Sequence, residues 1–150
     1  MGHVPPKADE LARIGLFGAV EKHAVEFLCE RTECKTLPPG RVVFEEGTHG
    51  AALFVILNGT VEVLKRDEVG GERPVAVLGA GKWFGDMSLI DLQPRSATVR
   101  TRSVVSLLQI HAADLEALYR YDMRAYCVLT LNLARELSRR LRESDPDFNR

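Results

Sequence analysis

The sequence predicts a mainly β fold with flanking helices: an antiparallel β-roll, similar to a double-stranded jelly roll, with an N-terminal helical segment and two C-terminal helices. Three observations support this prediction. A helical pattern of apolar residues comes before Pro38-Pro39-Gly40, short runs rich in Val, Ile and Phe follow it, and a helical pattern returns after His111. About seven short strands bounded by turn residues are typical of an antiparallel sandwich, barrel or roll.

The N-terminal segment, about residues 9–37, is expected to be helical. Apolar residues recur every three or four positions from Ile14 to Leu28 and would form one face of a helix. Gly15 and Gly18 weaken the middle of this pattern, so one helix and two short ones both remain compatible with it.

The β-roll is expected over about residues 38–111. Strands are predicted at residues 41–45, 53–57, 61–63, 74–78, 95–101 and 104–110. Asn58-Gly59 lies between two of these runs and predicts a β-hairpin, because both residues tolerate positive φ. Gly70-Gly71 and Gly79-Ala80-Gly81 predict further turns.

The C-terminal part, about residues 112–142, is expected to form a short helix and a long one. The long helix carries an apolar stripe from Tyr126 to Leu141. This stripe can pack on the roll of its own chain or against the same helix of a second subunit. Residues 143–150 are expected to form a polar tail. We expect residues 1–150 to be a single domain with no DNA-binding domain.

The composition excludes several classes of protein. A net charge of −1 argues against a chain that coats nucleic acid, and no apolar run approaches the length of about 20 residues that spans a bilayer. We expect a cytoplasmic protein whose three cysteines, Cys29, Cys34 and Cys127, are reduced thiols. Neither these cysteines nor the four scattered histidines complete a metal site, so no metal, no cofactor and no enzymatic activity are expected.

The segment after the predicted turn at Gly79-Ala80-Gly81 has the chemistry of a phosphate and sugar site. Gly85 followed by Asp86–Ile90 indicates a short helical turn whose free N–H groups suit an anion. Arg95 offers a planar fork of donors that matches two phosphate oxygens. Asp86 has the wrong charge for a phosphate but suits a ligand with hydroxyl groups. A ribose phosphate satisfies both requirements.

These residues carry a resemblance to a known family. Phe84-Gly85-Asp86-Met87-Ser88-Leu89-Ile90, followed after a short gap by Pro94-Arg95-Ser96-Ala97-Thr98-Val99, resembles the phosphate-binding cassette of the cyclic-nucleotide-binding domain family. The family includes the ligand-binding domains of the catabolite activator protein and of cyclic-nucleotide-dependent kinase regulatory subunits. The resemblance covers nearly the whole chain, and the cassette, at residues 84–99, is its specific part.

The resemblance implies a role for each cassette residue. Gly85 would present its backbone to the ribose, and Asp86, where the family usually has Glu, would bind the 2′-hydroxyl with a shorter reach. Arg95 would bind the exocyclic phosphate oxygens. The candidate ligand-binding set from the cassette is completed by Phe84, by the amides of Met87 and Ser88, by the hydroxyl and amide of Ser96, and by Ala97.

The family often covers the base from its C-terminal helix, where this chain offers Arg139 or Arg140. A solvated helix face is the ordinary alternative for these arginines. Asp86 also has ordinary alternatives: it could cap its own helix or form an ion pair with Arg95. The empty site is expected to face solvent, so that replacing Arg95 would leave the fold intact.

Two functions follow from these expectations. The first is a stand-alone sensor that binds cyclic AMP, or cyclic GMP, and passes a movement of its C-terminal helices to a homodimer partner or an effector protein. The second is a degenerate module of the same fold that docks a partner without a ligand. Ser96 can serve either purine, so the residues leave the choice between cyclic AMP and cyclic GMP open.

Overall fold

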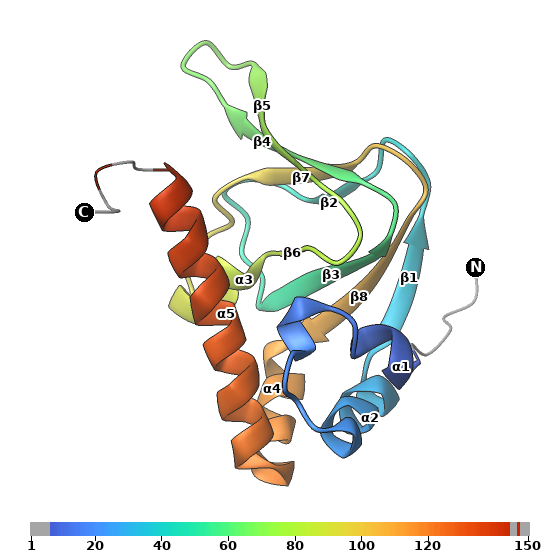
Figure 1. The fold of residues 1–150 in the computed structure, drawn as a ribbon. Coiled ribbons are helices and arrows are strands. Elements are labelled where there is room, and N and C mark those ends of the chain that lie inside the picture. The colour runs from blue at the N-terminus through green and yellow to red at the C-terminus, as the bar shows by residue number, and fades with distance from the viewer. Residues whose placement is uncertain (1–6, 145–146, 148–150) are drawn as a thin grey trace.

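The computed structural model describes residues 7–144 and residue 147. This part of the chain forms a β-roll of two four-stranded antiparallel sheets with helices beside it, so the expected fold class is confirmed (Figure 1). One sheet contains, in spatial order, β1 (Glu33–Leu37), β8 (Val105–His111), β3 (Ala52–Asn58) and β6 (Trp83–Phe84). The other contains β2 (Val42–Phe44), β7 (Thr98–Thr101), β4 (Val61–Arg66) and β5 (Glu72–Leu78).

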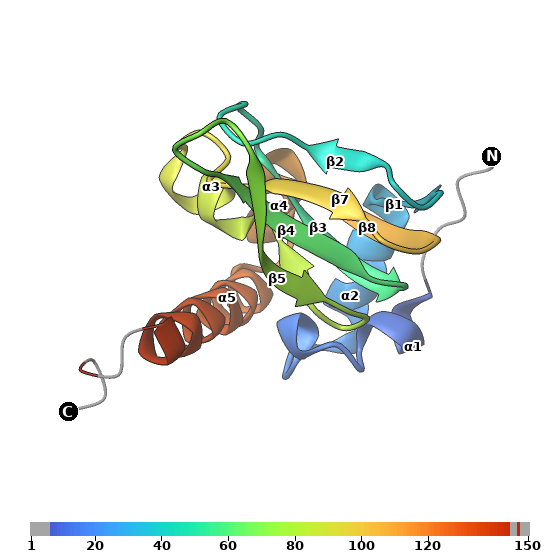
Figure 2. The same ribbon diagram turned by 90° about the horizontal axis from the view of Figure 1, so that it is seen from above.

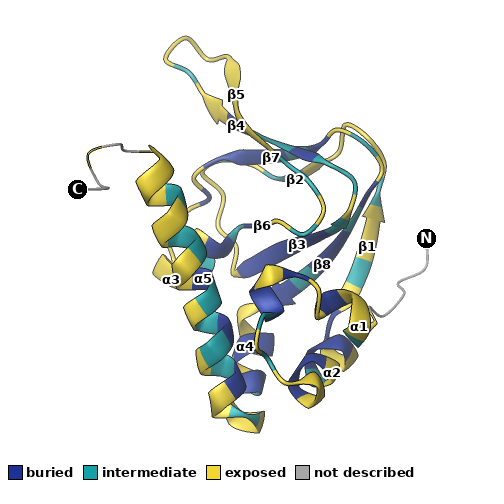
Figure 3. Cartoon of the chain, in the orientation of Figure 1, coloured by how far each residue is buried: buried dark blue, intermediate teal, exposed yellow. Residues whose placement is uncertain are grey.

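The two faces of strand β3 build two separate cores. Phe54 and Ile56 point between the sheets and pack with residues such as Val99. Leu53 and Val55 point to the other side and pack against the helices. This alternation follows from the period of two in a strand, and both faces are buried because the roll covers one and the helices cover the other (Figures 2 and 3).

The Asn58-Gly59 turn does not form a hairpin, so that prediction is wrong. The strands on its two sides, β3 and β4, lie in different sheets. Gly59 has a φ of 89°, and a Cβ there would lie 2.2 Å from the carbonyl oxygen of Val104. Glycine therefore lets the chain pass close to the start of β8 while it crosses between sheets. The turn at Gly70-Gly71 is confirmed as a hairpin, since β4 and β5 pair across it.

The N-terminal segment consists of short helical pieces rather than one helix. They are α1 (Ala8–Leu11), the 3₁₀ turn η1 (Gly15–Phe17) and α2 (Lys22–Arg31). The expected helical segment extended to residue 37, but its last residues form β1. Five residues of β1, from Glu33 to Leu37, pair antiparallel with β8, and this long-range pairing decides their conformation.

The C-terminal helices are α4 (Ala112–Tyr121) and α5 (Met123–Ser144), as expected. The apolar stripe of α5 packs on its own domain as far as Leu133, where Leu129 and Leu133 are buried in the core beneath the helices. Asn132 fixes the same part of α5, because its amide donates to the carbonyl oxygens of Leu16 and Gly18 at 2.9 and 2.8 Å. Leu141, at the far end of the stripe, is 48% exposed.

Candidate functional site

A short helix, α3 (Asp86–Asp91), follows β6 directly, as the sequence predicts. Gly85 begins it with a φ of 84°, a conformation that L-residues other than glycine rarely adopt. A Cβ on Gly85 would lie 2.8 Å from Nη1 of Arg95 and 3.0 Å from the carbonyl oxygen of Ala52. Glycine is therefore required here both by the backbone and by the close approach of Arg95.

The Arg95 side chain is buried, with 5% of the residue exposed. Nη1 donates to the carbonyl oxygen of Gly85 and Nη2 to that of Ala52, both at 2.9 Å, and the guanidinium lies 4.2 Å from the ring centre of Phe44. Burial lowers the pKa of Arg95 from its ordinary value. The expectation that the site faces solvent is therefore wrong for this side chain.

No carboxylate among residues 7–144 forms an ion pair with Arg95. The expected alternative in which Asp86 pairs with Arg95 is wrong. A buried cation without a counter-ion is costly, so a site of this kind favours an anion from outside the chain.

Asp86 is also buried, with 1% of the residue exposed, but its partner is Arg140 of α5. Nη1 of Arg140 lies 3.2 and 3.4 Å from the two carboxylate oxygens of Asp86, and Nη2 donates to the carbonyl oxygen of Trp83 at 3.1 Å. Gly85 occupies the N-cap position of α3, and no side chain caps the helix. The capping alternative for Asp86 is therefore wrong as well.

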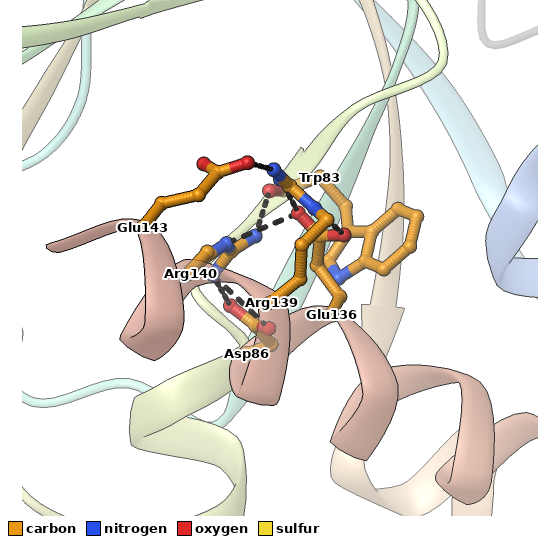
Figure 4. Close-up of polar contacts among 6 residues, drawn as sticks. All are labelled: Trp83, Asp86, Glu136, Arg139, Arg140 and Glu143. Atoms are coloured by element: carbon orange, nitrogen blue, oxygen red, sulfur yellow. Dashed lines mark hydrogen bonds and ion pairs between the residues drawn. The ribbon is translucent and has the colours of Figure 1, made fainter. Parts of the chain in front are cut away.

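A second network surrounds Arg140 on the same helix (Figure 4). Arg139 bonds to both Glu136 and Glu143, and Nε of Arg140 lies 3.4 Å from Oε1 of Glu136. Arg139 lowers the pKa of Glu136, and the two carboxylates raise the pKa of Arg139. Neither glutamate was expected at the site, although a spacing of three or four residues from an arginine is the signal for such pairs.

All ten candidate residues line one pocket of about 350 Å³ between the cassette, the β4–β5 hairpin and α5. They are Phe84, Gly85, Asp86, Met87, Ser88, Arg95, Ser96, Ala97, Arg139 and Arg140. The other lining residues were not among the expected ligand-binding residues; they are Phe44, Val63, Ala76, Leu78, Lys82, Trp83, Val99, Glu136 and Glu143. The apolar members among these come mostly from strands of the second sheet, and the pocket therefore has one apolar wall and one charged wall.

Two findings concern other kinds of site. In residues 7–144 and 147, no group of three or more His, Cys, Asp or Glu side chains could hold a metal ion. No helix in the same part of the chain is long and apolar enough to cross a membrane.

Comparison with known proteins places this fold and pocket in context. Residues 34–122 match the family described as "Cyclic nucleotide-binding domain". The chain is 34% identical over 134 residues to the cyclic AMP receptor protein of Thermus thermophilus, covering 89% of this chain and 60% of that protein. It is 33% identical over 108 residues to a cyclic nucleotide-gated potassium channel of Mesorhizobium japonicum, covering 72% of this chain and 28% of the channel.

A solved structure agrees with these sequence relatives. The cyclic nucleotide-binding domain from Methylobacillus flagellatus superposes with a TM-score of 0.84 at 28% identity, covering 95% of this chain and 84% of that one. The chain spans 60% or less of the length of the two curated relatives named above. The match over residues 34–122 includes the cassette and all of both sheets except Glu33. The chain belongs to the cyclic nucleotide-binding domain family.

Proposed function

We propose that this chain binds a cyclic nucleotide monophosphate, cyclic AMP or alternatively cyclic GMP, and acts as a sensor rather than as an enzyme. The observation that carries this proposal is Arg95: a buried guanidinium on the wall of a 350 Å³ pocket with no carboxylate partner among residues 7–144. A cyclic phosphate carries one negative charge and offers two exocyclic oxygens, which matches what a guanidinium can bind.

The rest of the cassette supports the phosphate and ribose assignment. The amides of Met87 and Ser88 lie in the first turn of α3, where N–H groups have no partner within the helix. Ser96 adds a hydroxyl beside Arg95, and the carboxylate of Asp86 suits a ribose hydroxyl. We propose that Gly85 brings its backbone against the same sugar.

The apolar wall supports a purine base as the other half of the ligand. Val63 of β4 and Ala76 and Leu78 of β5 line the pocket opposite the charged residues of α5. Such a wall binds the flat face of a base without selecting its edge groups, so it serves adenine and guanine alike. We favour cyclic AMP because the Thermus relative is named as a cyclic AMP receptor. Arg139 remains the candidate to cover the base.

The C-terminal helices are the proposed route from the pocket to a partner. Arg139 and Arg140 line the pocket, while Leu131 on the same helix is 49% exposed. A ligand that changes the position of α5 would therefore change the surface that a second copy or an effector protein contacts. We propose that the partner is either a second copy of this chain or an effector protein.

A specific observation favours a second candidate function. The carboxylate of Asp86 is already bonded to Arg140, so the site is partly filled by the chain itself. On this alternative the domain docks a partner without a ligand.

Titration calorimetry with cyclic AMP, cyclic GMP and 5′-AMP separates the two functions. The sensor proposal predicts binding of a cyclic nucleotide and at least tenfold weaker binding of 5′-AMP, whose phosphate carries more charge and lies outside a ring. Absence of binding by either cyclic nucleotide at millimolar concentration contradicts the sensor proposal and supports the docking module.

A further inference from the structure

Asp86 and Arg140 form an ion pair in the pocket wall where the proposed function places the ribose. The Asp86 side chain is 2% exposed and that of Arg140 is 35% exposed, so the guanidinium lies between the carboxylate and the solvent (Figure 4). Both carboxylate oxygens of Asp86 face the same nitrogen of Arg140, at 3.2 and 3.4 Å. A ligand hydroxyl that bonds to this carboxylate therefore has to compete with the guanidinium.

The same arginine holds the far end of α5 to the roll. The buried residues of α5 end at Leu133, and Leu141 is half exposed. Beyond Leu133, Arg140 is hydrogen-bonded to the first residue of α3, Asp86, and to the carbonyl oxygen of Trp83 in β6. These bonds tie the end of a long helix to the two elements that begin the cassette.

Arg140 also has a second partner to which it can move. Its Nε lies 3.4 Å from Oε1 of Glu136, one turn earlier on α5, and this glutamate is held in place by Arg139. The guanidinium can therefore leave Asp86 without losing every carboxylate partner, and the cost of release stays moderate.

We propose that Arg140 is a specificity-determining residue that competes with the ribose 2′-hydroxyl for Asp86, and that in the ligand-free protein the same arginine holds the end of α5 to the roll. The ligand part of the proposal rests on the proposed function, since it requires a cyclic nucleotide in the pocket. The helix part rests on the contacts of Arg140 alone. Because of the competition, the chain discriminates weakly between ribose and deoxyribose ligands.

The first experiment compares the Kd values of cyclic AMP and 2′-deoxy cyclic AMP for the wild type, Arg140→Gln and the control Arg135→Gln. Arg135 is an exposed arginine on the same helix, so both variants lose the same charge. The ratio of the two Kd values cancels the long-range attraction of the anionic ligand. We expect this ratio to rise about fivefold to tenfold in Arg140→Gln, in favour of the ribose ligand, and to stay unchanged in Arg135→Gln.

Adding Asp86→Asn shows whether Arg140 and the ribose 2′-hydroxyl compete for the carboxylate of Asp86. In this background Arg140→Gln should no longer change the ratio, because there is no carboxylate for the arginine to cover. If the ratio of the two Kd values is unchanged or falls in Arg140→Gln while the wild type binds cyclic AMP, the proposed competition is wrong. The proposed function is not affected by this result. Failure of every variant to bind either nucleotide contradicts the proposed function itself, and the competition with it.

The second experiment needs no ligand. Hydrogen exchange of the ligand-free protein should be at least threefold faster at the amides of residues 137–144 in Arg140→Gln than in Arg135→Gln, with residues 125–133 unchanged. The fluorescence of Trp83, which is the single tryptophan of the protein, should change in the same variant. Equal exchange in the two variants overturns the proposal that Arg140 holds the end of α5.

Discussion

The guanidinium of Arg95 donates a hydrogen bond to the carbonyl oxygen of Gly85 at 2.9 Å, so the side chain proposed to bind the phosphate is anchored to the N-cap residue of α3. A second bond of the same length runs to the carbonyl oxygen of Ala52 at the start of β3. The two nitrogens of one planar group thus hold two segments of the chain at a fixed separation. Arg95 therefore fixes the shape of the proposed phosphate site as well as supplying its charge.

Replacing Arg95 with Ala should affect ligand binding more than it affects folding. Loss of a charge-assisted, two-point contact should weaken cyclic AMP binding by about 2–4 kcal/mol. The two carbonyl oxygens left without a donor should each cost about 1–3 kcal/mol of stability, and removal of a buried, unpaired charge should offset much of this cost. Lys should restore only part of the binding, because one ammonium cannot hold both carbonyls and the phosphate. Calorimetry and chemical denaturation measure the two quantities.

Thermal melting provides an independent check of the same variant. Cyclic AMP at about 100 times the wild-type Kd should stabilise the wild type by about 2.7 kcal/mol and Arg95→Ala by less than about 1 kcal/mol. Equal stabilisation of both proteins would place the phosphate away from Arg95.

Gly85→Ala should disrupt the proposed phosphate site, whereas Gly40→Ala should not. Both glycines have positive φ, 84° and 80°, so both variants carry a backbone cost of about 1–2 kcal/mol. Only at Gly85 would the new Cβ meet Arg95, at 2.8 Å; nothing lies within 4 Å of a Cβ at Gly40. We therefore expect a larger loss of stability for Gly85→Ala, together with at least tenfold weaker cyclic AMP binding. Similar affinities for the two variants would contradict this account.

Asp122 should stabilise the junction of α4 and α5 in a pH-dependent way. One carboxylate oxygen accepts from the backbone N–H of Ala125 at 3.1 Å, and the other lies 2.8 Å from Nε2 of His23. Both contacts favour the ionised form and lower the pKa of Asp122 below its ordinary value of 3.8. Its contribution is therefore complete above that value and is lost as the pH falls through the lowered pKa.

The variant Asp122→Ala should lower the melting temperature at pH 7 by about a few degrees. The difference from the wild type should disappear as the pH falls below the pKa of Asp122. His23→Ala removes one of the two contacts and keeps the bond from the backbone N–H of Ala125, so it should have the smaller effect. An effect of His23→Ala that equals or exceeds that of Asp122→Ala would show that the bond from the Ala125 N–H to Asp122 contributes nothing.

The three thiols should differ strongly in reactivity. Burial, together with the neighbouring Cys34 and Glu26, raises the pKa of Cys29 to about 11, and burial also raises the pKa of Cys34. Cys127 is exposed on α5. Since the thiolate is the reactive form, alkylation at pH 8 should label Cys127 rapidly and Cys29 only after unfolding. Mass spectrometry of the labelled peptides tests this order, and Cys127→Ser should remove the fast phase.

The cassette could be predicted from sequence because its signals are local. Gly85, the short helix after it and Arg95 all lie within eleven positions, and the structure brings them together around one pocket. The partner of Asp86 lies 54 positions away on α5, and no local pattern indicates that separation. The direction in which α5 crosses the roll decides that contact, and it depends on the packing of the whole domain.

The strands show the same difference between local signals and long-range packing. The hairpin at Gly70-Gly71 follows from its own residues, whereas β1 forms because β8, about 70 positions later, supplies its hydrogen bonds. At Asn58-Gly59 the local signal indicated a hairpin, and the packing of two sheets placed its strands apart. Turn residues tell where the chain bends, but they do not tell which strand it joins afterwards.

The two bonds from Asn132 to the N-terminal segment fix the middle of α5, so the outer part of the helix would rotate about this point. The helix continues beyond Leu133 to Ser144, a distance of about 16 Å at the usual rise per residue. A rotation of about 10° at this point would carry the last turn through about 3 Å. On the proposed function, the outer half of α5 would act as a lever arm that enlarges a small rearrangement beside the pocket into a larger displacement at the end of the helix.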